Sequence, residues 1–407
     1  MAPEPRSIVV VGAGIFGITA ALELRARGWI VTVIDPGPVP RSTAASTDIS
    51  KVVRMDYGAD DLYTTMAEAA MEGWDDWNSA SAAPLYHQDG FLLLSRDAMA
   101  RGGFEYESLE RLRRRGHAAE RLRPGDLNGR FSAWSADQYR DGYFNPRAGW
   151  VESGKVLERL AAEAEARGVT LIQGVRFEGL IESRGRVRGI RIADARAIRA
   201  AGGPAAGSEV RADVVLAAAG AWTPTLLPHL ADVMWATGHP VVHLDVQGAG
   251  DWQAPRFPVW AADISRTGWY GFPAVATGLL KIARHGAGRR VEPDAPRTVL
   301  PAELAPFHEF LQESLPGLRD RPIAATRLCL YCDTFDGDFW IDHDPDRAGL
   351  VVAAGDSGHG FKFAPVLGPL TADIVECQPN PWAHRFRWRR RAAEGKEAAR
   401  AMYRLRR

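Results

Sequence analysis

The chain has 407 residues, of which 46% are hydrophobic and 25% charged. These are ordinary globular values, and they exclude disordered, collagen-like and coiled-coil proteins. Lysine plus arginine and aspartate plus glutamate number 50 each, so no net field recruits nucleic acid or an anionic membrane. At about 150 residues per domain, the length predicts two or three domains.

The N-terminal apolar run leads into glycines instead of a cleavage site, which is typical of a strand and not of a signal peptide. No uninterrupted apolar stretch approaches the length that spans a bilayer. The three cysteines cannot form a disulfide framework, which fits a reducing compartment. We therefore expect a cytoplasmic protein with no integral membrane segment and no nucleic-acid partner.

A glycine-rich turn follows the first predicted strand directly. The order is strand, G-x-G-x-x-G, helix, strand and acid, at Ser7–Val11, Gly12 to Gly17, Ile15–Arg27, Trp29–Ile34 and Asp35. Gly12 makes the tight turn, Gly14 lets the backbone approach a pyrophosphate, and Gly17 lets helix and strand pack closely. Asp35 is placed to accept hydrogen bonds from a ribose hydroxyl. The pattern predicts a Rossmann-like unit that binds NAD or FAD.

The rest of the chain alternates helical and strand-like patterns. We expect helices ending near Trp77, over Glu105–Arg115, over Val156–Arg167 and up to Cys377, and strands over Phe91–Ser95, Ala212–Ala219 and Gly349–Ala354. Between Val241 and Lys281, strands rich in aromatic residues predict an antiparallel sheet that forms one wall of a substrate cavity, with Trp252, Trp260, Trp269 and Tyr270. The last residues predict a basic helical tail that packs loosely on the body.

Two cysteines, Cys329 and Cys332, have C-x-x-C spacing in "RLCLYCD". A zinc site would need two further ligands at suitable spacing, and a redox dithiol is expected at a helix N-terminus, whereas this stretch is strand-like. The residues alone leave open a packing role or attachment of a larger group.

Four further stretches carry a resemblance to a known family. They are "ISKVVR" at 49–54, "WYGFPAVATGLLKIARHG" at 269–286, "CLYCDTFDGDFWIDHDP" at 329–345 and "AGDSGHGFKF" at 354–363. With the N-terminal glycines, they resemble D-amino-acid-oxidase-like FAD-dependent oxidoreductases, in particular the branch of monomeric sarcosine oxidase and the amadoriases (fructosyl amino acid oxidases). The likeness runs from Ile8 to about Cys377.

The resemblance implies an α/β fold in which a Rossmann-like FAD-binding domain is discontinuous. Its expected segments are 1–86, 147–233 and 333–378. A substrate domain built on a mixed or antiparallel sheet is expected over 87–146 and 234–332, followed by the basic helical tail at 379–407. A monomer is implied.

The resemblance also implies roles for single residues. Cys329 carries FAD through a thioether, while Cys332 has no role. Lys281 promotes the reaction of reduced flavin with oxygen, and Arg54 and Lys362 hold the substrate carboxylate. Tyr270, His285 and Tyr331 fall on active-site positions. The implied FAD-binding residues are Gly12, Gly14, Ile15, Phe16, Gly17, Asp35, Lys51, Val175, Gly220, Trp222, Gly355, Gly358, Gly360, Phe361 and Lys362, and no metal is implied.

The implied activity is an FAD-dependent oxidase of a secondary amine or N-substituted amino acid. Hydride passes from the carbon next to nitrogen to flavin N5, and reoxidation by O2 gives H2O2 and an imine. Alternatives are a flavin dehydrogenase that passes electrons to a quinone or protein, or an oxidase of a specialised metabolite. Lys51, Gly337 and Asp338 depart from the sarcosine oxidase pattern and put sarcosine itself in doubt, so the substrate stays open among sarcosine, pipecolate, saccharopine and fructosyl amino acids.

Overall fold

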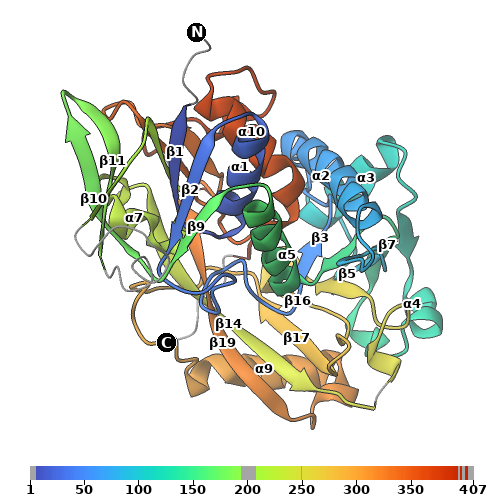
Figure 1. Cartoon of the computed structure of the whole chain (residues 1–407). Coiled ribbons are helices and arrows are strands. Elements are labelled where there is room, and N and C mark those ends of the chain that lie inside the picture. The colour runs from blue at the N-terminus through green and yellow to red at the C-terminus, as the bar shows by residue number, and fades with distance from the viewer. Residues whose placement is uncertain (1–5, 194–207, 249, 393–394, 397–398, 402–407) are drawn as a thin grey trace. The chain divides into compact units, whose positions relative to one another are not determined.

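The computed structural model describes residues 6–193, 208–248, 250–392, 395–396 and 399–401. The chain divides into two compact units (Figure 1). Unit 1 comprises Met1–Asp48, Ser153–Ala236 and Leu330–Lys396, and unit 2 comprises Ile49–Glu152, Thr237–Cys329 and Glu397–Arg407. The segment 49–86, which we expected with the FAD-binding elements, clusters within unit 2.

Unit 1 is built on a six-stranded sheet with the order β20-β21-β13-β1-β2-β9. These strands are β20 (Trp340–His343), β21 (Leu350–Ala354), β13 (Val214–Ala217), β1 (Ser7–Val11), β2 (Ile30–Asp35) and β9 (Thr170–Gln173). All neighbours are parallel except β20 and β21. The predicted strands in this set are confirmed, and β1 lies near the middle of the sheet, where both of its faces are buried.

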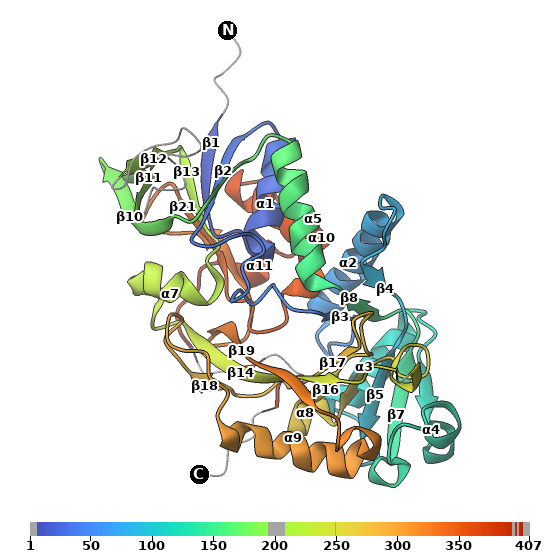
Figure 2. The ribbon, with the colours of Figure 1, turned by 60° about the horizontal axis from the view of Figure 1, so that its bottom comes forward.

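Both faces of that sheet are covered (Figure 2). On one face lie α1 (Ile15–Ala26), α5 (Ser153–Ala166) and α10 (Ala364–Val375), with α1 packed against the other two. On the other lies an antiparallel sheet of β10 (Arg176–Ser183), β11 (Arg186–Ala193) and β12 (Ser208–Arg211). Side chains alternate along β1, so Val9 and Val11 join the core under the small sheet while Val10 meets Gly17 of α1.

Unit 2 holds a large mixed sheet with the order β18-β14-β17-β16-β15-β5-β7-β6, in which β19 also pairs with β14. The strands are β5 (Phe91–Ser95), β6 (Glu120–Leu122), β7 (Asp141–Asn145), β14 (Met234–Asp245), β15 (Val259–Ala262), β16 (Trp269–Gly271), β17 (Leu279–Arg284), β18 (Arg289–Arg290) and β19 (Ile323–Thr334). The antiparallel sheet expected between Val241 and Lys281 is confirmed by β14, β16 and β17.

The tryptophans of this region do not line a cavity as we expected. Trp260 and Trp269 stack on Phe310 of helix α9 (Pro301–Ser314), with ring centroids 5.6 and 4.5 Å apart, and Trp252 belongs to the same buried cluster. Because neighbouring side chains on a strand point to opposite faces, Tyr270 points away from this cluster. The tryptophans of this region therefore belong to the core under α9.

Unit 2 also contains a small sheet and four further α-helices. The sheet has the order β3-β8-β4, made of β3 (Lys51–Val53), β8 (Gly149–Val151) and β4 (Tyr86–His87). The helices are α2 (Asp61–Ser79), α3 (Phe104–Arg114), α4 (Pro124–Arg130) and α8 (Ile264–Thr267). Asp60 caps α2 by accepting a hydrogen bond from the Tyr63 amide at 3.1 Å. The predicted helices α2, α3, α5 and α10 are confirmed.

The predicted basic helical tail is wrong over the residues that can be described. Only α11 (Ala383–Phe386) is helical, and 387–392 form no helix. The cause is tertiary: Arg389 makes a two-pronged ion pair with Asp336 at 2.6 and 2.7 Å, and Arg385 pairs with Asp338 at 2.5 Å. In unit 2, Arg400 is buried and donates to the Gly286 carbonyl at 2.8 Å. The tail is thus packed tightly where it is described, and 393–394, 397–398 and 402–407 lie outside the described residues.

In the described part of the chain, no helix combines the length and the hydropathy needed to cross a membrane.

Candidate active site

The glycine turn at the end of β1 has the geometry that its sequence predicts. Gly12 has φ +107°, and a Cβ there would lie 2.5 Å from the Ala218 carbonyl oxygen. A Cβ on Gly17 would lie 1.9 Å from the Gly12 carbonyl oxygen. Packing therefore requires glycine at both positions. At Gly14 an added Cβ would meet nothing closer than Ser46 Oγ at 3.4 Å, so the bare backbone there leaves the N-terminus of α1 open to a ligand.

Asp35 ties the end of β2 to that turn. Its carboxylate is buried and accepts hydrogen bonds from the amides of Ala13 and Gly37 at 3.0 and 3.1 Å. Burial raises the pKa of Asp35 above its usual value, although these two donors oppose the shift. The Asp35 carbonyl also accepts from the Val175 amide at 3.2 Å. Asp35 thereby joins the glycine turn after β1 to the loop after β9, which holds the predicted residue Val175.

Two buried hydroxyls of unit 1 show that this region fits a polar cofactor. Ser46 Oγ accepts from the Ile15 amide at 3.0 Å, and beside it Thr47 Oγ1 is buried with no hydrogen-bond partner among the described residues. The same is true of Thr223 Oγ1, which follows Trp222. A buried hydroxyl left unsatisfied costs about 1–3 kcal/mol. A bound group with phosphate or ribose oxygens would satisfy such atoms.

The loop after β21 gathers another set of predicted residues in unit 1. A Cβ on Gly358 would lie 2.2 Å from the Tyr331 ring, and one on Gly360 would lie 2.8 Å from the Phe16 ring. Lys362 is buried and donates to the His359 carbonyl at 2.7 Å. The glycines therefore let the loop lie directly against two aromatic rings, and Lys362 stays next to it.

Other predicted positions flank these two regions. Gly355 and Gly220 have φ +72° and +53°, and Gly220 opens the short 3-10 helix that carries Trp222. The Trp222 ring lies 4.4 Å from the Arg41 guanidinium carbon. Phe361 is buried.

The two cysteines of β19 lie on opposite faces of the strand because they are three residues apart. Cys332 is fully buried in the apolar core of unit 1, with its Sγ 4.0 Å from Met234 Sδ, and burial raises its thiol pKa well above the usual value. Cys329 shares the other face with Tyr331. The spacing therefore does not bring the thiols together, and within the described ranges no three histidine, cysteine or acidic residues form a group that could hold a metal ion.

Lys281 is a buried cation in unit 2, with 1% of its surface exposed. Its ammonium donates to the Ser50 carbonyl at 2.8 Å and lies 4.9 Å from the centre of the Phe272 ring. The strand register places Tyr270 opposite Ala283 and His243 opposite Lys281. Directly paired residues point to the same face, so Tyr270, Lys281 and the buried His243 share one side of the sheet. Sequence reasoning had not marked His243.

His285 follows β17 directly and is 6% exposed. Its amide donates to the Gly268 carbonyl at 2.7 Å, and its own carbonyl accepts from the Ala401 amide at 3.1 Å. The described end of the tail thus contacts the backbone of a predicted active-site residue.

Arg54 follows β3 and is 4% exposed. Its guanidinium carbon lies 5.1, 6.0 and 5.8 Å from the ring centres of Tyr57, Phe91 and Phe104. Lys281 contacts Ser50, the residue before β3, and Arg54 directly follows β3, which begins with Lys51. Lys281, Lys51 and Arg54 therefore belong to one region of unit 2, and their association with Lys362 of unit 1 stays a prediction.

Asp56 is a buried carboxylate that sequence reasoning missed. It accepts from the Tyr143 hydroxyl at 2.6 Å and from Asn145 Nδ2 at 3.3 Å. The available signal was an acid two residues after Arg54 in an otherwise apolar run, "VVRMDYG". Nothing in the local pattern marks the two residues of β7.

Comparison with known proteins gives consistent matches along the chain. The model of the FAD dependent oxidoreductase family matches residues 7–374. A monomeric sarcosine oxidase from Bacillus sp. (strain B-0618) is 25% identical over 373 residues, 90% of this chain and 91% of that protein. An L-saccharopine oxidase from Schizosaccharomyces pombe is 29% identical over 417 residues, covering 94% and 93%. The crystal structure of a fructosamine oxidase (Amadoriase II) from Aspergillus fumigatus is 27% identical, with a TM-score of 0.77 over 94% of this chain and 89% of that one.

Proposed function

Because the chain belongs to the FAD dependent oxidoreductase family, we propose that it is an oxidase of a secondary amine or N-substituted amino acid. The proposed products are H2O2 and an imine, which hydrolyses or, if cyclic, persists. The observation that carries the proposal is the pair of buried cations in unit 2, Lys281 and Arg54. Lys281 is held by the carbonyl of Ser50 and Arg54 by that of Asp56, so two positive charges are fixed in position within a buried part of the unit.

FAD, when bound, supplies the two-electron acceptor for the amine and the donor for oxygen. We propose that unit 1 holds its phosphates and ribose at the N-terminus of α1 and at Asp35, with the unsatisfied hydroxyls of Thr47 and Thr223 as further partners. The loop with Gly355, Gly358 and Gly360 is proposed to hold its ring system. Unit 2 is proposed as the substrate domain, with Lys51 at the cofactor.

A covalent link between FAD and Cys329 is part of the proposal. It is supported by the separation of the two thiols, since Cys332 is committed to the core while Cys329 lies on the face of Tyr331. None of the three cysteines forms a disulfide, and a cytoplasmic setting stays part of the proposal. A monomer remains the proposed state.

Arg54 is proposed to bind the substrate carboxylate. A guanidinium can donate two parallel hydrogen bonds to a carboxylate, and the surrounding aromatic rings lower the local dielectric, which strengthens such a pair. Lys362 is proposed as a second cation for the same group, and Tyr270, His285 and Tyr331 as groups that orient the amine. The chain thus fixes the acid end of the substrate and leaves the carbon next to nitrogen to react.

Lys281 is proposed to stabilise the negative charge that develops on oxygen during reoxidation. Its ammonium is held in place by the Ser50 carbonyl, so the charge is fixed before the reaction begins. A preorganised charge of this kind costs no reorganisation at the moment of electron transfer.

In the described part of the tail, three arginines do not contribute to the docking surface on which the dehydrogenase alternative relied. Acceptor docking was expected on a loosely packed basic tail, but Arg385, Arg389 and Arg400 are engaged within their own units. Truncation from residue 383 would remove these contacts and would not be a clean test. Stoichiometric peroxide under air would support the oxidase, and turnover only with a quinone or protein acceptor would support the dehydrogenase.

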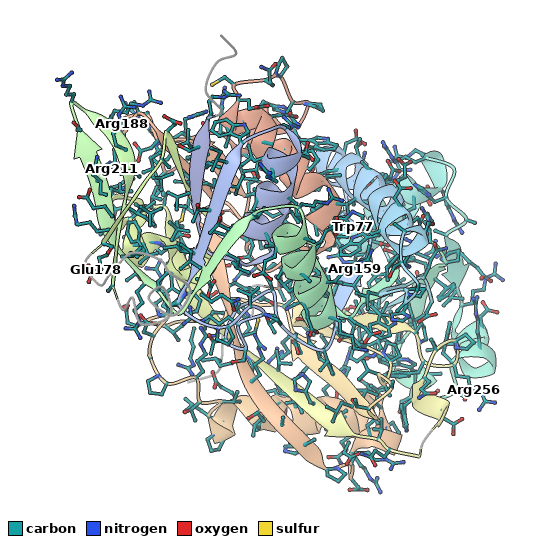
Figure 3. The ribbon with its side chains drawn as sticks, in the orientation of Figure 1. Trp77, Arg159, Glu178, Arg188, Arg211 and Arg256 are labelled. Carbon is teal, nitrogen blue, oxygen red and sulfur yellow. The ribbon has the colours of Figure 1, made fainter. Side chains whose placement is uncertain are left out.

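The substrate class can be tested by a peroxide-coupled screen of sarcosine, pipecolate, proline, saccharopine and fructosyl amino acids. We expect the best substrate to carry a carboxylate next to a secondary amine, and Arg54→Gln to raise its KM far more than it lowers kcat. Arg256→Gln serves as the control, because Arg256 lies on the surface and forms an exposed ion pair with Asp251 (Figure 3). If amines without a carboxylate are oxidised equally well, the role of Arg54 is wrong.

A further inference from the structure

Asp56 is a fully buried charged residue that the proposed function leaves unused. Its exposed fraction is 0%, as are those of Tyr143 and Asn145, which hold its two carboxylate oxygens at 2.6 and 3.3 Å. Those two residues are two apart on β7 and so project from the same face. Burial and the neighbouring Asp56 raise the pKa of Tyr143 well above its usual value, so its hydroxyl remains a donor.

Asp56 is also electrostatically coupled to Arg54. The Arg54 guanidinium donates through Nη1 to the backbone carbonyl of Asp56. Burial raises the pKa of the Asp56 carboxyl, and the Arg54 charge is the largest influence that opposes this shift. Both residues are buried among aromatic rings, where charges interact more strongly than in water.

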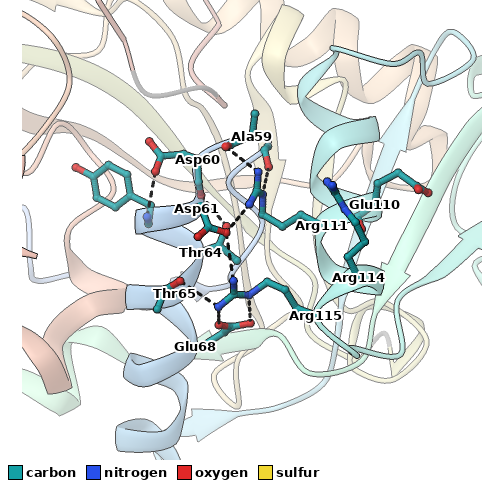
Figure 4. A network of polar contacts seen from close by, with 12 residues as sticks. Ala59, Asp60, Asp61, Thr64, Thr65, Glu68, Glu110, Arg111, Arg114 and Arg115 are labelled. Carbon is teal, nitrogen blue, oxygen red and sulfur yellow. Dashed lines mark hydrogen bonds and ion pairs between the residues drawn. The ribbon is translucent and has the colours of Figure 1, made fainter. Parts of the chain in front are cut away.

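The backbone that carries this pair is clamped by α3 (Figure 4). The Gly58 amide donates to Ser108 Oγ at 2.8 Å, while Arg111 donates to the carbonyls of Gly58 and Ala59 at 3.1 and 2.9 Å and forms an ion pair with Asp61. The turn that follows Asp56 is therefore held against α3 by several hydrogen bonds. Because this backbone is held in place, we expect the charges of Arg54 and Asp56, and not a movement of the loop, to control how strongly Arg54 binds a ligand.

We propose that Asp56 is the internal counter-ion of Arg54 and that it sets the affinity of the site for carboxylate-bearing ligands. This inference rests on the proposed function, in which Arg54 binds the substrate carboxylate. An incoming carboxylate gains the attraction of Arg54 but meets the repulsion of Asp56. The site thereby rejects simple anions and favours ligands whose remaining groups make further contacts, so Asp56 is a specificity-determining residue and not a catalytic one.

The test uses the FAD-loaded protein and two isosteric probes, picolinate and picolinamide. Neither has an oxidisable C–H bond next to nitrogen, and only the first carries a carboxylate. Dissociation constants are measured by calorimetry for the wild type and for Asp56→Asn, whose amide oxygen can still accept from Tyr143. Removing one unit charge near Arg54 should tighten picolinate binding by about tenfold at an effective dielectric near that of protein surfaces. Picolinamide affinity should stay within about twofold, since it carries no net charge.

Two further variants separate the possible results. Asp251→Asn removes an acid from the exposed pair with Arg256 in the same unit and should change neither affinity (Figure 3); tightening there as well would overturn the proposal. Arg54→Gln should lose the preference for picolinate, and if it does not, the proposed function fails. If Arg54→Gln behaves as expected while Asp56→Asn binds picolinate no more tightly than the wild type, only the counter-ion role of Asp56 fails.

A second substitution covers the case in which Asp56→Asn does not fold. Tyr143→Phe removes one hydrogen bond that favours the ionised form of Asp56 and leaves the residue in place. The pKa of Asp56 rises further, so a larger fraction of this carboxyl is protonated and repels the ligand less. Picolinate should bind more tightly than to the wild type, with the same sign as for Asp56→Asn. Unchanged or weaker picolinate binding in this variant would contradict the proposal.

Discussion

The two cysteines of β19 offer a paired test in which one substitution changes cofactor attachment and the other changes stability. Cys329→Ser removes the proposed thioether, whereas Cys332→Ser places a hydroxyl in the apolar core of unit 1 beside Met234. The two positions differ by three residues on one strand, and both replacements are of the same kind. Each variant therefore serves as the control for the other.

The cost at Cys332 follows from its surroundings. Its side chain is fully buried, and its neighbours in the core, such as Phe335 and Trp340, are apolar. Burying a hydroxyl in place of the thiol in such an apolar surrounding costs about 2 kcal/mol. For a unit of this size, about 2 kcal/mol lowers the melting temperature by roughly 4 to 8 °C.

The assay combines thermal unfolding with denaturation by acid, after which protein and free flavin are separated. The wild type and Cys332→Ser should retain yellow colour in the precipitated protein, and Cys329→Ser should release it. Cys332→Ser should melt lower than the wild type by the stated amount. Colour that stays with the Cys329→Ser precipitate, or that is absent from the wild-type precipitate, would refute the thioether, and an unchanged melting temperature for Cys332→Ser would refute the packing argument.

Two other substitutions test the site and the tail. Lys281→Met should slow the reaction of reduced enzyme with O2 by orders of magnitude in stopped-flow, while anaerobic reduction by substrate stays nearly unchanged. The reason is that the fixed ammonium is lost and a side chain of similar length remains. Unaltered oxygen reactivity would contradict this assignment. Arg389→Ala should lower the urea-derived unfolding free energy by about 2 kcal/mol after allowance for partial exposure, whereas Arg211→Ala, from an exposed pair, should lower it by less than about 0.5 kcal/mol. Burial opposes ionisation of Asp336, but Arg389 outweighs it and holds the pKa of Asp336 below its usual value. The difference in unfolding free energy between Arg389→Ala and the wild type should therefore be full above about pH 5 and should shrink as pH falls below about 4. A difference independent of pH would contradict the ion pair.

The tail illustrates a limit of local pattern reading. A run rich in arginine and alanine predicts a helix, yet the described residues after α11 follow an irregular path. Arg385 and Arg389 instead find their partners, Asp338 and Asp336, in a loop about 50 residues away in the chain. A bidentate ion pair and contact with the Trp340 ring at 4.4 Å outweigh the small gain per residue from helix propensity.

The sequence by itself determined the N-terminal Rossmann-like unit and the positions of the main helices. Gly12, Gly17 and Asp35 lie within one short stretch, and their roles depend on local turns and on side-chain period, which spacing records directly. The resemblance to FAD-dependent oxidoreductases added two further predictions, the FAD cofactor and the candidate cations of the active site. Only the tertiary structure decided which buried groups meet: Lys281 with Ser50, 231 residues away, and Asp56 with Tyr143, 87 residues away. Such contacts depend on how distant strands pair and pack, and no local period encodes them.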